Sequence, residues 1–189
     1  MKKLPVGKKA AAAAAILRKS GIVIMPAGTV YGLFCRALDP AAVRKIFGIK
    51  KRDVKKPLQV FLSSVDEIKK YAVITPGLMD RVKKYLPGPY TVILKLKPAY
   101  KKVFTFLSTG TIGIRVVNKG MAAEVVRVMR EPVAATSANL SGKPAPKTFA
   151  EVEYEVLKHA DYCADFDAEA CGSPSSVVDL TGDEDVVVR

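Results

Sequence analysis

The stretch PVAATSANLSGKPAP, residues 132–146, joins an apolar run to a burst of small polar residues. Residues 133–136, VAAT, form a short and mainly apolar run, as expected of a buried β-strand. Close behind them come side chains that form hydrogen bonds and a glycine: Thr136, Ser137, Asn139, Ser141 and Gly142. A turn needs only two or three such residues. The stretch therefore predicts a strand that ends either in a long loop or in a loop that binds a ligand.

Apolar runs that end in turn residues recur along the whole chain. They predict further strands at residues 22–25, 58–62, 91–96, 112–117, 176–180 and 186–188. Helices are expected between them at residues 10–17, 41–49 and 122–130, at Thr75 followed by Pro76, and at the capping-box sequences SVDE (64–67) and TFAE (148–151). No linker or repeat divides the chain, so we expect a single α/β domain over residues 1–189, built around a mixed, twisted sheet.

Composition narrows the class of protein. The 189 residues are 49% hydrophobic, enough for a real core. The longest uncharged apolar run, residues 10–17, is too short to span a bilayer. It leads into Arg18 and Lys19 and not into a cleavage site, so we expect a cytoplasmic protein with no membrane partner. The cysteines have no CxxC spacing and only one histidine beside them, which favours free thiols over a disulfide framework or a zinc site: Cys35, Cys163 and Cys171.

The charge is unusual for a protein of this size. Thirty-one Lys and Arg residues against 18 Asp and Glu give a net charge of +13. Such an excess favours a polyanionic partner, which could be a nucleic acid, a nucleotide or a membrane surface. Charge alone selects no reaction.

Four more polar clusters adjoin expected strands: MPAGTVYGL (25–33), KIFGIKKRDVKKPL (45–58), TGTIGIRVV (109–117) and GSPSSVVDL (172–180). Lys50 and Arg52 in the second are either a solvated basic face or a phosphate clamp. Arg115 interrupts an apolar strand and should face a cleft, a partner carboxylate or an anionic ligand, because burying an unpaired charge is costly. The chain has no Walker loop, GxGxxG turn or HExxH motif. The inventory therefore suits the positioning of an anionic ligand, as in phosphoryl or nucleotidyl transfer.

Six motifs in this order resemble the short form of the YrdC-type threonylcarbamoyl-AMP synthases. They are PxxTVYGL (26–33), KKRxxxKPL (50–58), LPGPYT (86–91), TIGIRV (111–116), TSANxSG (136–142) and PSSVVD (174–179). The resemblance implies an open α/β sheet with a large basic concave cavity. It also implies the synthesis of threonylcarbamoyl-AMP and pyrophosphate from L-threonine, bicarbonate or CO2, and ATP with Mg²⁺. The product would serve proteins that transfer the threonylcarbamoyl group to tRNA, and the family is associated with binding of double-stranded RNA.

The resemblance also implies roles for individual residues. Lys50, Arg52, Ser137 and Asn139 match the catalytic positions that contact ATP. Further ATP contacts are implied for Thr111 and Arg189. Contacts to L-threonine are implied for Thr29, Arg115, Thr136 and either Ser175 or Ser176. No residue of the chain is expected to ligate a metal.

The chain departs from the family pattern in two places. Ala27 and Gly28 stand where relatives usually carry a Thr and an acidic residue, and Lys56 and Phe61 stand where some relatives have Asn and His. Two alternatives therefore stay open. One is a non-catalytic RNA-binding module, which the charge favours. The other is a paralogue with changed chemistry, such as the carbamoyl-handling domain of hydrogenase maturation proteins.

Overall fold

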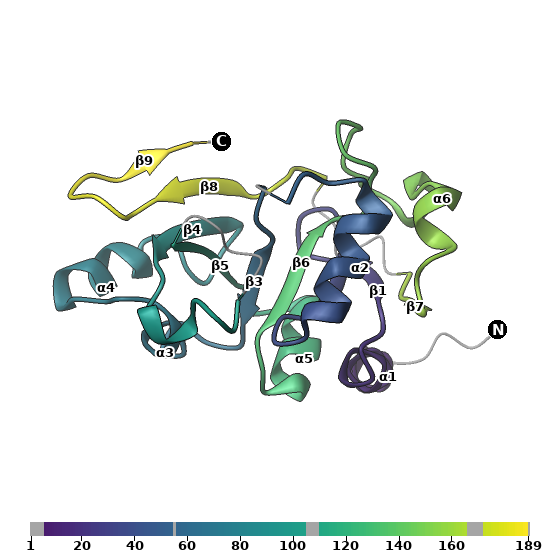
Figure 1. Ribbon diagram of the computed structural model, residues 1–189, viewed down its shortest axis with the longest axis horizontal. Coiled ribbons are helices and arrows are strands. Elements are labelled where there is room, and N and C mark those ends of the chain that lie inside the picture. The colour runs from purple at the N-terminus through teal and green to yellow at the C-terminus, as the bar shows by residue number, and fades with distance from the viewer. Residues whose placement is uncertain (1–5, 55, 105–109, 166–171, 189) are drawn as a thin grey trace.

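One mixed sheet organises the computed structural model, which describes residues 6–54, 56–104, 110–165 and 172–188. The sheet has nine strands in the order β7–β1–β2–β6–β3–β5–β4–β8–β9 (Figure 1). The pairs β1–β7, β3–β5 and β4–β8 are parallel, and the other pairs are antiparallel. The strands are β1 (Val23–Pro26), β2 (Tyr31–Arg36), β3 (Gln59–Leu62), β4 (Tyr90–Lys95), β5 (Thr111–Val116), β6 (Val133–Ser137), β7 (Tyr162–Cys163), β8 (Ser176–Asp179) and β9 (Val186–Val187).

Helices connect the strands, and two of the helices have an N-cap residue whose side chain accepts a hydrogen bond from the backbone. The helices are α1 (Val6–Arg18), α2 (Pro40–Lys50), α3 (Ile68–Tyr71), α4 (Pro76–Lys83), α5 (Gly120–Met129) and α6 (Tyr154–Leu157), with 3₁₀ turns at Pro98–Tyr100 and Phe149–Glu151. Asp39 caps α2 by accepting from the backbone N–H groups of Ala41 and Ala42. Thr75 caps α4, as expected, because its hydroxyl accepts from Leu78 N at 3.3 Å. None of the described helices is long and apolar enough to cross a membrane.

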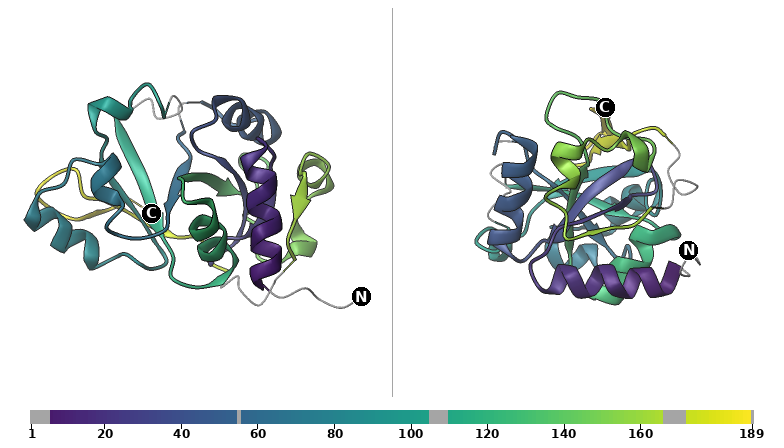
Figure 2. Two further views of the ribbon diagram at one scale, coloured as in Figure 1. Left: turned by 90° about the horizontal axis from the view of Figure 1, so that it is seen from below. Right: turned by 90° about the vertical axis from the view of Figure 1, so that its right-hand side faces the viewer.

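Successive side chains of a strand point to opposite faces of the sheet, so the buried residues form two core clusters, one on each face. Val23 and Met25 of β1 pack with α1 and α5, whereas Ile22 and Ile24 pack into the cluster that includes residues of α2, α3, α4 and α6. Figure 2 shows α1 and α5 lying side by side beneath the sheet. The alanine-rich helix α1 belongs to this layer: Ala10, Ala13, Ala14 and Leu17 are fully buried.

The seven expected strands are confirmed, with ends that differ by no more than one residue. The sequence analysis placed a polar cluster at residues 25–33 and no second strand there, but β2 begins at Tyr31. Gly32 weakens the strand pattern, because glycine is uncommon inside strands. The glycine is required at this position because a Cβ would lie 2.7 Å from the Phe34 ring. The short strand β7 was also missed.

The first capping box forms in part, because the Ser64 hydroxyl accepts from Glu67 N at 3.4 Å, and the second does not form. Glu67 accepts from the backbone and hydroxyl of Ser63, one residue before the expected partner, and α3 begins only at Ile68. Glu151 accepts from Lys147 N at 2.7 Å, and the helix expected there is a single 3₁₀ turn. In each case the carboxylate closes a loop and does not cap a helix.

Cys35 and Cys163 are free thiols, and burial raises the pKa of each. Cys171 lies outside the described residues.

Candidate active site

A cavity of about 470 Å³ opens on one face of the sheet, a size typical of small-molecule sites. Thr111, Gly113 and Arg115 of β5 line it, and they alternate with Ile112, Ile114 and Val116, which are packed into the core on the opposite face. The cavity thus shares a face with α1 and α5. Its polar lining consists of Thr29, Tyr31, Arg52, Gln59, Thr91, Thr111, Arg115, Thr136, Ser137, Asn139, Lys143 and Ser175.

Arg115 is a buried cation whose side chain is held by two neighbours. Only 3% of the residue is exposed, and its Nη1 atom donates to Oγ1 of Thr29 at 3.2 Å. Its guanidinium carbon lies 4.9 Å from the centre of the Phe61 ring, because Phe61 and Arg115 are directly paired across β3 and β5. This geometry keeps the guanidinium at the cavity wall, where it can receive a carboxylate or a phosphate.

Thr29 is held in place by the turn between β1 and β2. Ala27 N donates to Val30 O at 2.9 Å, and Gly28 between them has a φ of +78°, a conformation that favours glycine. Thr29 O in turn accepts from Gly172 N at 2.8 Å. Ala27 and Gly28, which differ from the usual residues of the family, thus form the tight turn that directs the Thr29 hydroxyl toward Arg115.

The loop that follows β6 is closed by its own polar side chains. Ser137 Oγ donates to Asn139 Oδ1 at 2.5 Å, and Asn139 Nδ2 donates to Leu140 O at 3.0 Å and to Lys143 O at 2.5 Å. Ser137, Asn139 and Lys143 also line the cavity. The small polar residues therefore shape a loop, and this loop borders a cavity. The binding of a ligand by the loop stays a prediction.

Lys50 lies beneath this loop and is not among the residues that line the cavity. It is the last residue of α2 and is 1% exposed. Its Nζ atom donates to Ser137 O at 2.5 Å, to Asn139 O at 2.6 Å and to Asn139 Oδ1 at 3.0 Å. Burial and the charge of Arg52 lower the pKa of Lys50 to about 7, whereas the three oxygen acceptors favour the charged form.

Two further cations stand at the cavity. Arg52 lines it and donates from Nε to Lys56 O at 2.8 Å and from Nη2 to Pro57 O at 3.1 Å, which folds the basic loop after α2. Lys143 Nζ lies 2.7 Å from Oε2 of Glu153, and this pair is partly exposed. No Asp or Glu is among the described residues that line the cavity, so its charged groups are positive.

A second polar cluster joins the cavity on the β8 side. Thr91 Oγ1 and Ser175 Oγ are buried and 3.0 Å apart, and Gln59 Nε2 donates to Ser175 Oγ at 3.4 Å. Ser175 lines the cavity and Ser176 does not, because neighbouring residues point to opposite sides of the chain as β8 begins. Ser175 is therefore the serine of this pair that lies at the cavity, and its contact to L-threonine stays a prediction.

The structure brings most of the expected site residues to one cavity: Thr29, Arg52, Thr111, Arg115, Thr136, Ser137, Asn139 and Ser175. Arg189 lies outside the described residues. Sequence reasoning assigned no role to Gln59, Thr91 or Lys143. Thr91 is the last residue of the LPGPYT motif and Lys143 directly follows TSANLSG, so their positions in or beside family motifs could have marked both as site residues. Gln59 was only a polar residue in an apolar run.

The sequence profile of the Sua5, YciO and YrdC proteins, described as "Telomere recombination", matches residues 15–189. The chain belongs to the Sua5/YciO/YrdC family. A provisionally named threonylcarbamoyl-AMP synthase of Methanocaldococcus jannaschii is 37% identical over 168 residues, which cover 89% of this family member and 78% of the relative.

The threonylcarbamoyl-AMP synthase of Pyrococcus abyssi is 32% identical over 178 residues, which cover 94% of this Sua5/YciO/YrdC domain and 52% of that enzyme. The solved structure of P. abyssi Sua5 complexed with L-threonine superimposes with a TM-score of 0.85 at 29% identity. It covers 100% of this chain and 55% of the other. The chain therefore spans about half the length of the P. abyssi protein.

Proposed function

We propose that this Sua5/YciO/YrdC domain is an enzyme, a nucleotidyltransferase that makes threonylcarbamoyl-AMP and pyrophosphate from L-threonine, bicarbonate or CO2, and ATP. The observation that carries the proposal is the convergence of two groups on one cavity. One is the Arg115–Thr29 pair, and the other is the set formed by Ser137, Asn139, Arg52 and Lys143. Relatives named threonylcarbamoyl-AMP synthases that align with most of the chain support it.

Arg115 and Thr29 suit the amino acid. A guanidinium that is fixed by a ring and a hydroxyl can bind a carboxylate in a defined orientation. P. abyssi Sua5 has been solved in complex with L-threonine, which supports the same substrate here. In this arrangement Arg115 takes the carboxylate and Thr29 aligns the guanidinium. The amine of the substrate is then left to react.

The loop after β6 and the basic loop after α2 suit the nucleotide. The threonine amine first combines with bicarbonate to give a carbamate and water. A carbamate oxygen then attacks the α-phosphorus of ATP, the bond to the β-phosphate oxygen breaks, and pyrophosphate leaves. Negative charge builds on the phosphoryl oxygens during this step, so Arg52 and Lys143 contribute by electrostatic stabilisation. Ser137 and Asn139 offer hydrogen bonds to the nucleotide, and Thr111 and Thr136 complete the polar wall. Lys50 contributes by holding the loop.

Magnesium would enter with the nucleotide. The described residues contain no group of three His, Cys, Asp or Glu side chains that could hold a metal ion. Mg²⁺ prefers oxygen ligands and keeps several waters, so the phosphates of ATP would supply its main ligands in a cavity whose described lining residues include no carboxylate. When bound, it would neutralise charge on the phosphates.

The charge of the surface supports a nucleic-acid partner. Eight lysines lie on α3, at the ends of α4 and β4, and on either side of the 3₁₀ turn Pro98–Tyr100, with seven of them exposed and none lining the cavity: Lys69, Lys70, Lys83, Lys84, Lys95, Lys97, Lys101 and Lys102. Such a surface attracts tRNA or double-stranded RNA. We propose that the product passes in the cytoplasm to proteins that transfer the threonylcarbamoyl group to tRNA.

The test is pyrophosphate release from ATP by the purified chain. We expect release that needs both L-threonine and bicarbonate and that falls when valine or serine replaces threonine. Ser137→Ala should reduce it strongly, whereas Ser141→Ala, an exposed serine of the same loop that does not line the cavity, should not. An inactive wild-type protein that binds RNA tightly, with affinity that falls steeply as salt rises, would contradict the proposal and favour an RNA-binding module.

A further inference from the structure

One wall of the cavity includes Val188, the residue that directly follows β9, the edge strand of the sheet. Val177 of β8 also lines the cavity, and Val188 N donates to Val177 O at 2.9 Å. Only two residue pairs otherwise join the strands, Val178 with Val187 and Asp179 with Val186. Such a short hairpin is not stable by itself, so this wall needs a second support.

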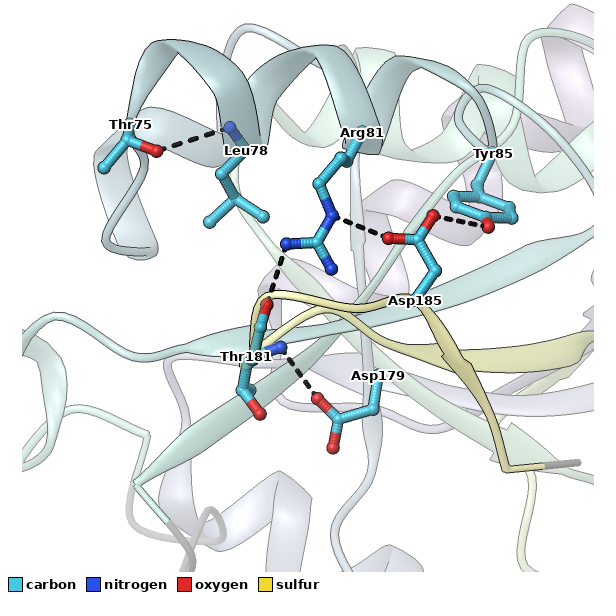
Figure 3. A network of polar contacts seen from close by, with 8 residues as sticks. Thr75, Leu78, Arg81, Tyr85, Asp179, Thr181 and Asp185 are labelled. Carbon is cyan, nitrogen blue, oxygen red and sulfur yellow. Dashed lines mark hydrogen bonds and ion pairs between the residues drawn. The ribbon is translucent and has the colours of Figure 1, made fainter.

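That support comes from α4 and the turn after it. Asp185, the residue before β9, accepts from Arg81 Nε at 2.6 Å and from the Tyr85 hydroxyl at 2.7 Å. Arg81 Nη1 also donates to Gly182 O at 2.7 Å, in the turn between β8 and β9 (Figure 3). The Arg81 and Asp185 side chains are 20% and 24% exposed, and the two hydrogen bonds to Asp185 act together with the one to Gly182 O.

The turn of the hairpin is also fixed internally. Thr181 N donates to Asp179 Oδ1 at 2.8 Å (Figure 3). Leu180 N donates to Ile93 O at 3.0 Å. The hairpin is therefore anchored at both ends of its turn, and Asp185 is the anchor that directly precedes β9. Arg81 and Tyr85 lie about a hundred positions before Asp185 in the sequence, and none of the three lines the cavity.

We propose that Arg81, Tyr85 and Asp185 form a clamp that positions β9 as a wall of the nucleotide site, which makes Asp185 a positioning residue for ATP. The inference rests on the proposed function for the identity of the ligand. Val177 and Val188 give the wall an apolar surface, and the adenine ring is the largest apolar face that the proposed substrates offer. Loss of the clamp frees β9, and ATP must then order the strand as it binds, which weakens its affinity.

The experiment compares Asp185→Ala with Asp183→Ala. Asp183 is an exposed residue of the same turn, so its replacement changes the net charge equally without touching the clamp. Three quantities are measured: hydrogen exchange of the Val188 amide, ATP affinity by titration calorimetry, and steady-state kinetics. For Asp185→Ala we expect faster exchange at Val188, a dissociation constant and KM for ATP about tenfold higher, and unchanged kcat and KM for L-threonine. Asp183→Ala should match the wild type.

Tyr85→Phe removes a single hydrogen bond and serves as the milder variant if Asp185→Ala does not fold. It should shift the same quantities in the same direction by a smaller factor. Unchanged exchange at Val188 would overturn the clamp. Faster exchange with unchanged ATP affinity, or a rise in KM for L-threonine alone, would overturn the role in the nucleotide site. A chain that releases no pyrophosphate but whose ATP affinity depends on Asp185 would refute the synthase while leaving the clamp supported.

Discussion

The ammonium nitrogen of Lys50 lies 3.0 Å from the side-chain oxygen of Asn139, a residue 89 positions further along the chain. Two backbone carbonyls of the same loop, at Ser137 and Asn139, accept from the same nitrogen. Lys50 thereby ties the end of α2 to the loop that borders the cavity. The shape of this loop depends on a cation that is placed beneath it and not inside the cavity.

Replacing Lys50 should therefore cost stability as well as activity. Lys50→Met removes a donor from the backbone carbonyls of Ser137 and Asn139 and one of the two donors to Asn139 Oδ1. A buried acceptor that is left unsatisfied costs about 1–3 kcal/mol. We expect a lower free energy of unfolding, measured by urea denaturation near neutral pH, together with a loss of pyrophosphate release because the loop is no longer held. Lys51→Met changes the exposed neighbour and should alter neither. A Lys50→Met protein that is inactive but as stable as wild type would indicate a direct contact with the phosphates.

The stability that depends on Lys50 should vary with pH. Its pKa is about 7 in the folded protein and near 10.5 in the unfolded chain. Between these values the unfolded chain binds a proton that the folded protein has released, so stability rises with pH across this window. It is lost as the pH falls from about 10.5 to about 7. The difference in unfolding free energy between wild type and Lys50→Met should thus grow as the pH rises from about 7 to about 10.5, and a constant difference would contradict the lowered pKa.

Arg115→Lys should impair the binding of L-threonine. Lysine keeps the charge but loses both the planar fork and the stacking on Phe61. A hydrogen bond to a charged group is worth about 1.5–3 kcal/mol, which predicts a KM for L-threonine roughly 10- to 100-fold higher, with a smaller effect on the KM for ATP. Arg127→Lys on the surface of α5, where Arg127 pairs with Glu124, is the matched control. An equal rise in both KM values would show that Arg115 does not select the amino acid.

Lys143→Met should weaken ATP binding. Lys143 lines the cavity and is paired with Glu153, and an incoming triphosphate can draw the ammonium away from that carboxylate. We expect the KM for ATP to rise roughly three- to tenfold, a modest factor because the partly exposed charge is screened by solvent. Lys158→Met is the control, since Lys158 forms a similar pair with Glu155 and does not line the cavity. Equal effects of the two changes would point to net charge and not to a contact in the site.

The sequence by itself determined the secondary structure of most of the sheet. Short β-branched runs bounded by turn residues report local preferences, and seven strands were placed to within a residue for this reason. The cap at Thr75 was equally local. Sequence also marked the polar clusters that lie beside the strands, and eight residues for which the family resemblance implied a role line the cavity.

Only the tertiary structure decided which of these residues face one another. β2 escaped prediction because Gly32 and Arg36 weaken its pattern, and it forms because β1 and β6 pair with it on both sides. The contact of Ser175 with Thr91, the place of Lys50 under its loop and the anchoring of Asp185 to Arg81 all join residues more than 80 positions apart. Sequence patterns describe neighbours within a turn or a strand, whereas such pairs are set by the order and register of the sheet.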